Sequence, residues 1–120
     1  ANATPVFADV DPQTYQISPE SIAARVTPKT KAIVVINPNN PTGALYGDAV
    51  LKEIIALARE HGLIIFADEI YDKMLYDEEK HVSLASMSTD VVVITFNGLS
   101  KNYRSCGYRA GWMVISARCS

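Results

Sequence analysis

Apolar residues along this chain gather in short runs that polar segments separate. Three of the runs are continuous, with no polar alternation: 32-AIVVI-36, 63-LIIFA-67 and 91-VVVITF-96. Runs of this length and composition are typical of strands that are buried on both faces of a parallel sheet. We therefore predict a strand at each of them, a fourth strand over 109–116 and a short strand over 6–10.

Two other segments carry the signals of helices. Over 48–62, apolar residues recur at helical spacing and charged residues lie off that stripe. Asp48 is placed to cap the start of this helix and Gly62 its end. A shorter helix is predicted over 18–26, because Ser18 followed by proline is a favourable helix start. Strands that alternate with helices predict an α/β domain with a layered sheet.

The length of 120 residues allows one domain, and the composition narrows the classes of function. The net charge is −2, with no basic patch and no long run of like charge. We therefore expect no nucleic-acid partner and no binding to a membrane surface. The apolar runs are also too short to cross a membrane, and no signal peptide is recognisable at the start.

Cysteine and histidine are sparse and isolated. Cys106 and Cys119 form no motif with each other or with His61 and His81. We therefore expect reduced thiols in a cytoplasmic protein, and no metal site.

Polar segments follow the three apolar runs. They are 37-NPNNPTG-43, 68-DEIY-71 and 97-NGLSK-101. The carboxyl ends of parallel strands share one edge of a sheet, and ligands collect there in open α/β folds. The sequence thus predicts amides, a carboxylate, a phenol and an amine at one edge.

Each of these residues also has a purely structural interpretation. Asparagine, proline and glycine are what a tight turn requires, and Asp68 could cap a helix. Tyr71 could be a half-buried core residue, Lys101 a solvated lysine and Arg109 a surface residue of the sheet. The joint occurrence of all three segments, in this order, favours a functional site over these separate explanations.

The same three segments, with an arginine eight residues after the lysine, resemble the fold-type I pyridoxal-phosphate aminotransferases of class I/II. The resemblance runs along essentially all of the chain, and FADEIYDKMLYDEEKH and FNGLSKNYRSCGYRAGWMV are most similar to bacterial alanine (glutamate–pyruvate) aminotransferases. It implies a three-layer α/β/α sandwich with a mostly parallel sheet and an antiparallel last strand. Residues 1–120 would be the central part of the large, cofactor-binding domain.

The resemblance also implies a catalytic set. Lys101 would form a Schiff base with the aldehyde of pyridoxal 5′-phosphate, and its freed amine would then move the proton between substrate and cofactor. Asp68 would pair with the pyridine nitrogen. Tyr71 and Asn40 would donate hydrogen bonds to the ring oxygen. Asp68 and Tyr71 are three positions apart, so one helical turn would put both on the same face.

Two further residues are implied as phosphate ligands. Arg109 would grip the phosphate with its planar fork, and Ser100 would add a hydroxyl. Many relatives carry a serine three positions before the lysine, but this chain has Gly98 there. The corresponding contact must therefore come from another residue, with Ser100 as the candidate.

The activity implied is transfer of an amino group between an amino acid, alanine or glutamate, and a 2-oxo acid, by a cytoplasmic homodimer. Several parts of such an enzyme have no counterpart in these residues: the small domain, the glycine-rich phosphate loop, the aromatic ring stacked on the cofactor and the arginine that binds the substrate carboxylate. We therefore expect the isolated segment to be inactive.

Two other functions remain open at this point. The same fold also hosts pyridoxal-phosphate-dependent lyases, and a non-enzymatic regulator can carry an aminotransferase-like domain. A nucleotide-binding domain is disfavoured, because no G-x-G-x-x-G follows a strand and no Walker lysine pattern is present.

Overall fold

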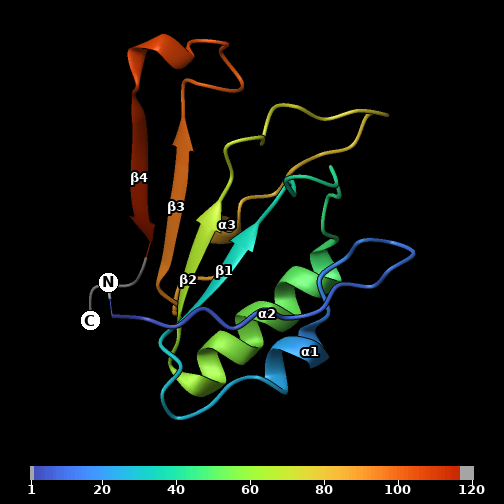
Figure 1. Cartoon of the computed structure of the whole chain (residues 1–120), viewed down its shortest axis with the longest axis vertical. Coiled ribbons are helices and arrows are strands. Elements are labelled where there is room, and N and C mark those ends of the chain that lie inside the picture. Colours follow the sequence, from blue (N-terminus) through green and yellow to red (C-terminus); the bar gives the residue numbers. More distant parts are fainter. Residues whose placement is uncertain (1, 117–120) are drawn as a thin grey trace.

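Four strands form one mixed sheet in the structure, a computed structural model that describes residues 2–116. The strands stand in sequence order: β1 (Ala32–Ile36), β2 (Ile64–Asp68), β3 (Val93–Gly98) and β4 (Gly111–Ser116). β1, β2 and β3 are parallel, and β4 returns antiparallel to β3 (Figure 1). The predicted mostly parallel sheet with an antiparallel last strand is confirmed.

Helices cover one face of this sheet (Figure 1). The long helix α2 (Asp48–His61) packs on the strands, and the short helix α1 (Pro19–Ala23) packs on α2. A one-turn helix α3 (Leu84–Met87) and a 3₁₀ turn η1 (Cys106–Tyr108) complete the regular structure. None of the described helices combines the length and the apolar character that crossing a membrane requires.

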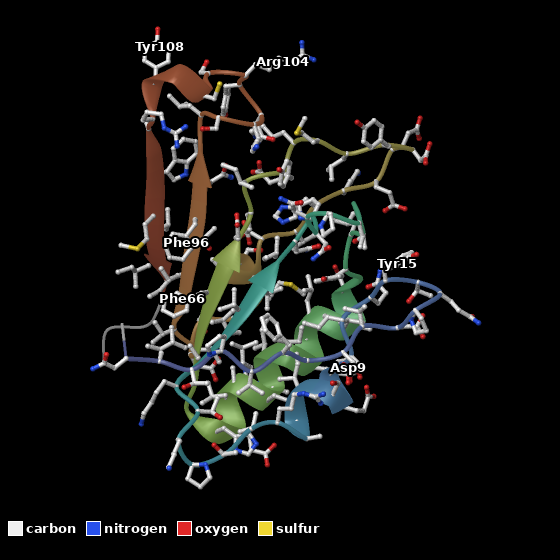
Figure 2. The ribbon with its side chains drawn as sticks, viewed as in Figure 1. Asp9, Tyr15, Phe66, Phe96, Arg104 and Tyr108 are labelled. Atoms are coloured by element: carbon white, nitrogen blue, oxygen red, sulfur yellow. The ribbon has the colours of Figure 1, made fainter. Side chains whose placement is uncertain are left out.

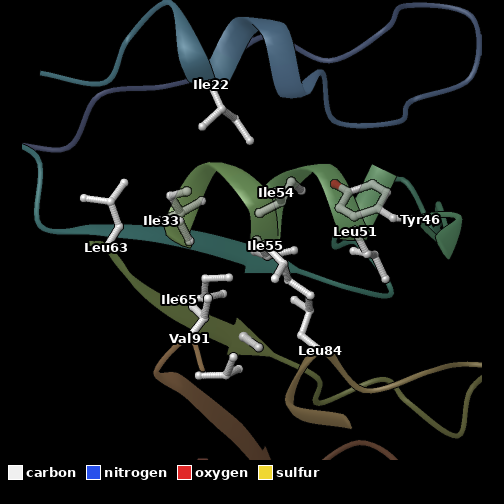
Figure 3. Close-up of a cluster of buried hydrophobic side chains, with 14 residues drawn as sticks. Ile22, Ile33, Tyr46, Leu51, Ile54, Ile55, Leu63, Ile65, Leu84 and Val91 are labelled. Carbon is white, nitrogen blue, oxygen red and sulfur yellow. The ribbon is translucent and has the colours of Figure 1, made fainter. Parts of the chain in front are cut away.

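The core lies between α2 and the sheet (Figure 3). The stripe of α2 predicted from its periodicity is the buried one, with Ile54 fully enclosed. On the sheet, the buried positions alternate, because successive side chains of a strand point to opposite faces. The buried strand residues, on the face that the helices cover, are Ile33, Val35, Ile65, Ala67, Val93 and Thr95.

The opposite face of the sheet carries no helix in residues 2–116. Val34 on β1 is 62% exposed and Phe96 on β3 is 37% exposed. The prediction of strands buried on both faces is therefore wrong for the described part of the chain, which contains the sheet and one helical layer. Phe66 and Phe96 pack on each other there, with ring centroids 6.0 Å apart.

Several element boundaries differ from the prediction. Residues 6–10 form no strand; within the described residues they contribute one isolated bridge, between Val10 and Ile17. The N-cap of α2 is Gly47, not Asp48, which lies in the first turn, where its charge complements the helix dipole. Gly62 ends α2 in the left-handed conformation, as predicted.

The first helix begins as predicted and ends early. The Ser18 hydroxyl accepts a hydrogen bond from the Ser21 N–H, 3.0 Å away, and so caps α1. The helix proper stops at Ala23, although the backbone N–H groups of the next three residues still bond to carbonyls in the preceding turn. Cys106 is exposed with a free thiol, and Cys119 lies outside the described residues.

Candidate functional site

The carboxyl ends of the three parallel strands meet at one edge of the sheet (Figure 1). Ile36, Asp68 and Phe96 are in register there. The pairing continues one residue further, because the Asn37 N–H donates to the Asp68 carbonyl and the Glu69 N–H to the Phe96 carbonyl, each at 3.0 Å. The three polar segments therefore leave the sheet side by side, as expected from the sequence.

Asp68 is the last residue of β2 and lies half-buried. By strand alternation its side chain lies on the face opposite α2, the face of Phe66. Its Oδ1 accepts a hydrogen bond from the Ile70 N–H, 3.1 Å away. No helix begins at Asp68, so neither the helix-cap interpretation nor the expected helical turn to Tyr71 is correct; residues 70–73 form a turn.

Lys101 lies in the turn that begins the connection between β3 and β4. The connection is closed by bonds from the Leu99 N–H to the Ala110 carbonyl and from the Ser105 N–H to the Leu99 carbonyl, both 3.1 Å. The Lys101 side chain is exposed, and its Nζ lies 5.8 Å from the centroid of the Tyr71 ring. At this separation an ammonium and an aromatic ring attract each other weakly. The fold thus brings the amine and the phenol from two different loops into one place.

Asn40 lies exposed in the loop after β1. The loop is anchored by its two neighbouring asparagines. Asn37 is buried, and its Oδ1 accepts from the Tyr46 N–H at 2.9 Å; the Asn39 Oδ1 accepts from the Thr42 hydroxyl at 2.8 Å. Asn37 had no role assigned from the sequence, although its position directly after a buried strand was a usable signal. The Asn40 amide takes part in none of these anchoring bonds.

Arg109 and Ser100 belong to the same connection as Lys101. Arg109 has a positive φ of 50° at the end of η1, and its guanidinium donates to the Cys106 carbonyl at 2.9 Å. Ser100 is half-buried. Within residues 2–116, no hydrogen bond joins Asn40, Ser100 or Arg109 to Lys101 or Asp68. The structure places these groups on the loops of one edge without direct contact.

The tip of the same connection points away from the sheet (Figure 2). Arg104 and Tyr108 project outward there, and Tyr108 is 79% exposed. Among the described residues, Arg104 makes a backbone bond within the turn, from its N–H to the Lys101 carbonyl, and its guanidinium makes none. This placement agrees with leaving Arg104 out of the candidate site.

Glu69, next to Asp68, is a buried carboxyl that sequence reasoning did not assign. Its Oε1 accepts hydrogen bonds from the Ser83 hydroxyl and the Leu84 N–H, both 3.0 Å, and so holds the start of α3. Burial raises the pKa of Glu69, against the lowering effect of these bonds and of nearby His81. The residue anchors the long loop that begins at the candidate site.

Replacing Glu69 by glutamine is expected to change how stability depends on pH. Because the folded-state pKa is raised, the folded protein binds this proton more tightly than the unfolded chain. The wild type should therefore lose stability relative to Glu69→Gln as the pH rises above the ordinary glutamate pKa of about 4.3. Denaturant midpoints measured at several pH values for both proteins check this.

The control is Glu60→Gln on the exposed side of α2. Its stability should run parallel to the wild type over the same pH range. Parallel curves for Glu69→Gln as well would contradict the expected effect of burial.

Gly98 occupies the position three before the lysine, where many relatives carry serine, and its surroundings are tight. A Cβ added there would meet the Ala110 carbonyl oxygen at 3.1 Å, the Gly111 Cα at 3.2 Å and the Ile70 Cδ1 at 3.4 Å. Two of these atoms are backbone of the antiparallel partner strand or the residue before it. A side chain at this position would therefore be tightly packed, and the neighbouring backbone of β4 would have to give by a few tenths of an ångström.

Substituting Gly98 by serine is expected to destabilise the folded protein by about 1–3 kcal/mol, because β4 must shift to admit the side chain. Chemical denaturation of the full-length protein measures the loss. Gly107→Ser is the matched control: it lies in the same connection, and a Cβ there meets nothing within 4 Å. Equal losses in the two variants would contradict the steric explanation.

An apolar cavity of about 630 Å³ lies elsewhere, between residues 5–10, α1 and the free edge of β1. It is lined by none of the six candidate residues. No group of three or more metal-ligating side chains occurs among the described residues. The chemistry-bearing groups are thus gathered at the strand ends, outside this cavity.

Comparison with known proteins identifies the family. The sequence model of the aminotransferase class I and II family matches residues 2–119. Glutamate–pyruvate aminotransferase AlaA of Escherichia coli strain K12 is 59% identical over 97 residues, which are 81% of this chain and 24% of that protein. Alanine aminotransferase of Mycobacterium tuberculosis strain H37Rv is 53% identical over 117 residues, 97% of this chain and 27% of that protein.

Solved structures agree with the sequence relatives. The crystal structure of an aminotransferase from Escherichia coli superimposes with a TM-score of 0.86 at 54% identity, over 88% of this chain and 26% of that one. The chain thus spans about a quarter of the length of the proteins it matches. Because the family match covers nearly all of the sequence and the sheet has the same architecture, this chain belongs to the class I and II aminotransferase family.

Proposed function

We propose that these residues are the central part of the large domain of a pyridoxal-phosphate-dependent aminotransferase. The reaction is transfer of an amino group between an amino acid, alanine or glutamate, and a 2-oxo acid. The observation that carries the proposal is the position of the Lys101 amine, 5.8 Å from the Tyr71 ring at the sheet edge where Asp68 ends β2. The names of the two sequence relatives support alanine and glutamate as substrates.

The proposed residues at this edge include one group for each part of the cofactor. The cofactor offers an aldehyde, a pyridine nitrogen, a ring oxygen and a phosphate. Lys101 would hold the aldehyde carbon, and Asp68 would hold a proton at the ring nitrogen. Tyr71 and Asn40 would donate to the ring oxygen. The cofactor, when bound, supplies the sink for the electrons that the reaction releases.

The phosphate would be held by two groups of the β3–β4 connection. Arg109 has one guanidinium N–H engaged with the Cys106 carbonyl, so its remaining donors are available to an anion. Ser100 adds a hydroxyl. An arginine suits this task because its planar fork can bind two phosphate oxygens at once.

The chain's own catalytic work is proton transfer by Lys101. Its Nζ would take the proton that leaves the substrate Cα and deliver it to the C4′ atom of the cofactor. The amine projects from an exposed side chain on a flexible four-carbon stem, so it can reach more than one atom of a bound ligand. Asp68 would keep the ring nitrogen protonated through its negative charge.

The proposal extends to the whole protein. A cytoplasmic homodimer is proposed, with the small domain and the groups that complete the site supplied by residues beyond this segment. The 120 residues alone are expected to show no amino-group transfer.

The test is an assay of the full-length protein with alanine and 2-oxoglutarate, alongside cystathionine as a lyase substrate. Pyruvate and glutamate formed in equal amounts support the aminotransferase. Cleavage of cystathionine without transfer would establish the lyase instead. Absence of both activities, in a protein that binds the cofactor, would favour a regulatory domain.

A further inference from the structure

A side-chain hydrogen bond links the two loops that carry the candidate catalytic groups. The Asn102 Nδ2 donates to the Asp72 Oδ1, across 30 positions of sequence. Asn102 directly follows Lys101, and Asp72 directly follows Tyr71. We call this pair the Asp72–Asn102 clasp. Within residues 2–116, it is the only side-chain hydrogen bond between the loop after β2 and the connection from β3 to β4.

Both ends of the clasp are mounted on turns whose backbone is itself bonded. The Asp72 N–H donates to the Glu69 carbonyl at 3.0 Å, and Glu69 is buried at the start of its loop. The Arg104 N–H donates to the Lys101 carbonyl at 3.2 Å, which closes the turn that contains Asn102. The clasp therefore connects two short, locally ordered segments and fixes the distance between them.

The Lys101 side chain is only weakly restrained by its own contacts within residues 2–116. It is exposed, its stem has four rotatable bonds, and its Nζ contacts the Tyr71 ring with a separation of 5.8 Å from the centroid. A weak contact at the end of a flexible stem does not define where the amine stands. Holding the backbone of Lys101 through its neighbour limits the region that the amine can reach.

The geometry of Asn102 indicates that the clasp is not explained by stability alone. Its Oδ1 is buried and accepts no hydrogen bond in the described structure. Burying an acceptor without a partner costs free energy, which offsets part of what the bond to Asp72 contributes. An apolar pair would fill the same space without that cost.

We propose that Asp72 and Asn102 are positioning residues that set how the Lys101 amine meets the cofactor aldehyde. They touch neither cofactor nor substrate; they hold the lysine's loop against the Tyr71 loop. This inference rests on the proposed function, since it assumes that Lys101 is the residue that links to pyridoxal 5′-phosphate.

The test reverses the clasp in the full-length protein. Asn102→Asp places two carboxylates together and opens it by repulsion, whereas the double variant Asp72→Asn with Asn102→Asp restores a carboxylate–amide pair in the opposite sense. The double variant also keeps the wild-type net charge, so it is the matched control. The readout is the rate at which cofactor-free protein, mixed with pyridoxal 5′-phosphate, acquires a borohydride-stable pyridoxyl group on Lys101, located by peptide mapping.

We expect Asn102→Asp to slow labelling of Lys101 about tenfold or more and the double variant to recover to within about threefold of the wild type. Melting temperatures of the cofactor-free proteins show whether a variant is merely less stable. If the clasp served stability alone, the labelling rate of the folded proteins would not fall in Asn102→Asp and recover in the double variant. If Asn102→Asp does not fold, Asn102→Ala is used, which removes the bond without adding charge and should slow labelling.

The outcomes that would overturn the inference are distinguishable. Suppose that the wild type is labelled at Lys101. If the folded single variants are then labelled at the same rate, or if a folded double variant does not recover, the clasp is refuted and the proposed function stays intact. Wild-type labelling at another lysine, or none although the cofactor binds, refutes the assignment of Lys101 and the clasp with it.

Discussion

Replacing Lys101 by alanine is expected to lower amino-group transfer by the full-length protein about 10⁴-fold or more. The substitution would remove both the proposed nucleophile and the group proposed to move the substrate proton. Single-turnover rates with alanine measure the loss. Lys101→Arg should be equally inactive, because a guanidinium keeps the charge but is not a usable nucleophile or base.

The control for this prediction is Lys80→Ala. Lys80 is exposed in the loop between Tyr76 and His81 and is none of the candidate site residues. Its removal should leave the rate within about twofold of the wild type. A Lys101→Ala protein that keeps substantial activity would show that the amine acts elsewhere.

Replacing Asp68 by asparagine is expected to lower the same rate by about a hundredfold to a thousandfold. Asparagine has nearly the same shape, and its Oδ1 can still accept the hydrogen bond from the Ile70 N–H. The turn after β2 should therefore persist, and the effect isolates the negative charge that is proposed to hold a proton on the ring nitrogen. Steady-state rates, together with the visible spectrum of the bound cofactor at several pH values, measure it.

Asp77→Asn is the matched control for the loss of one carboxylate. Asp77 is exposed in the loop after Tyr76 and has a positive φ of 54°, a conformation that asparagine tolerates well. Its rate should equal that of the wild type. A folded Asp68→Asn protein with the wild-type rate would mean that the charge of Asp68 is not used.

The four strands predicted for the sheet and the long helix agree with the structure because their signals are local; the strand predicted over 6–10 does not form. An unbroken β-branched run such as 32-AIVVI-36 is incompatible with most other placements, and it forms β1 with the predicted ends. The periodicity of 48–62 likewise requires one buried face, and α2 has it. By contrast, β2 and β3 start and end later than their apolar runs, because pairing with a neighbouring strand, not hydrophobicity, decides where a ladder stops.

Long-range contacts were beyond the sequence alone. Glu69 reaches α3 across 15 positions and the Asp72–Asn102 clasp spans 30, and no local pattern marks either pair. Gly98 is a similar case. In the sequence it was a missing serine, and the structure shows the backbone of Ala110 and Gly111 within 3.2 Å of the position that a Cβ would take.

The sequence by itself determined the order and type of the main elements, the edge of the sheet where the polar segments gather, and the family, because strand periodicity, turn chemistry and motif order are properties of neighbouring residues. Only the tertiary structure decided that one face of the sheet is open in residues 2–116 and that Lys101 stands beside Tyr71. It also decided which side chains hold the loops in place. These depend on the packing of segments that are far apart in the chain, where a shift of an ångström decides whether two groups meet.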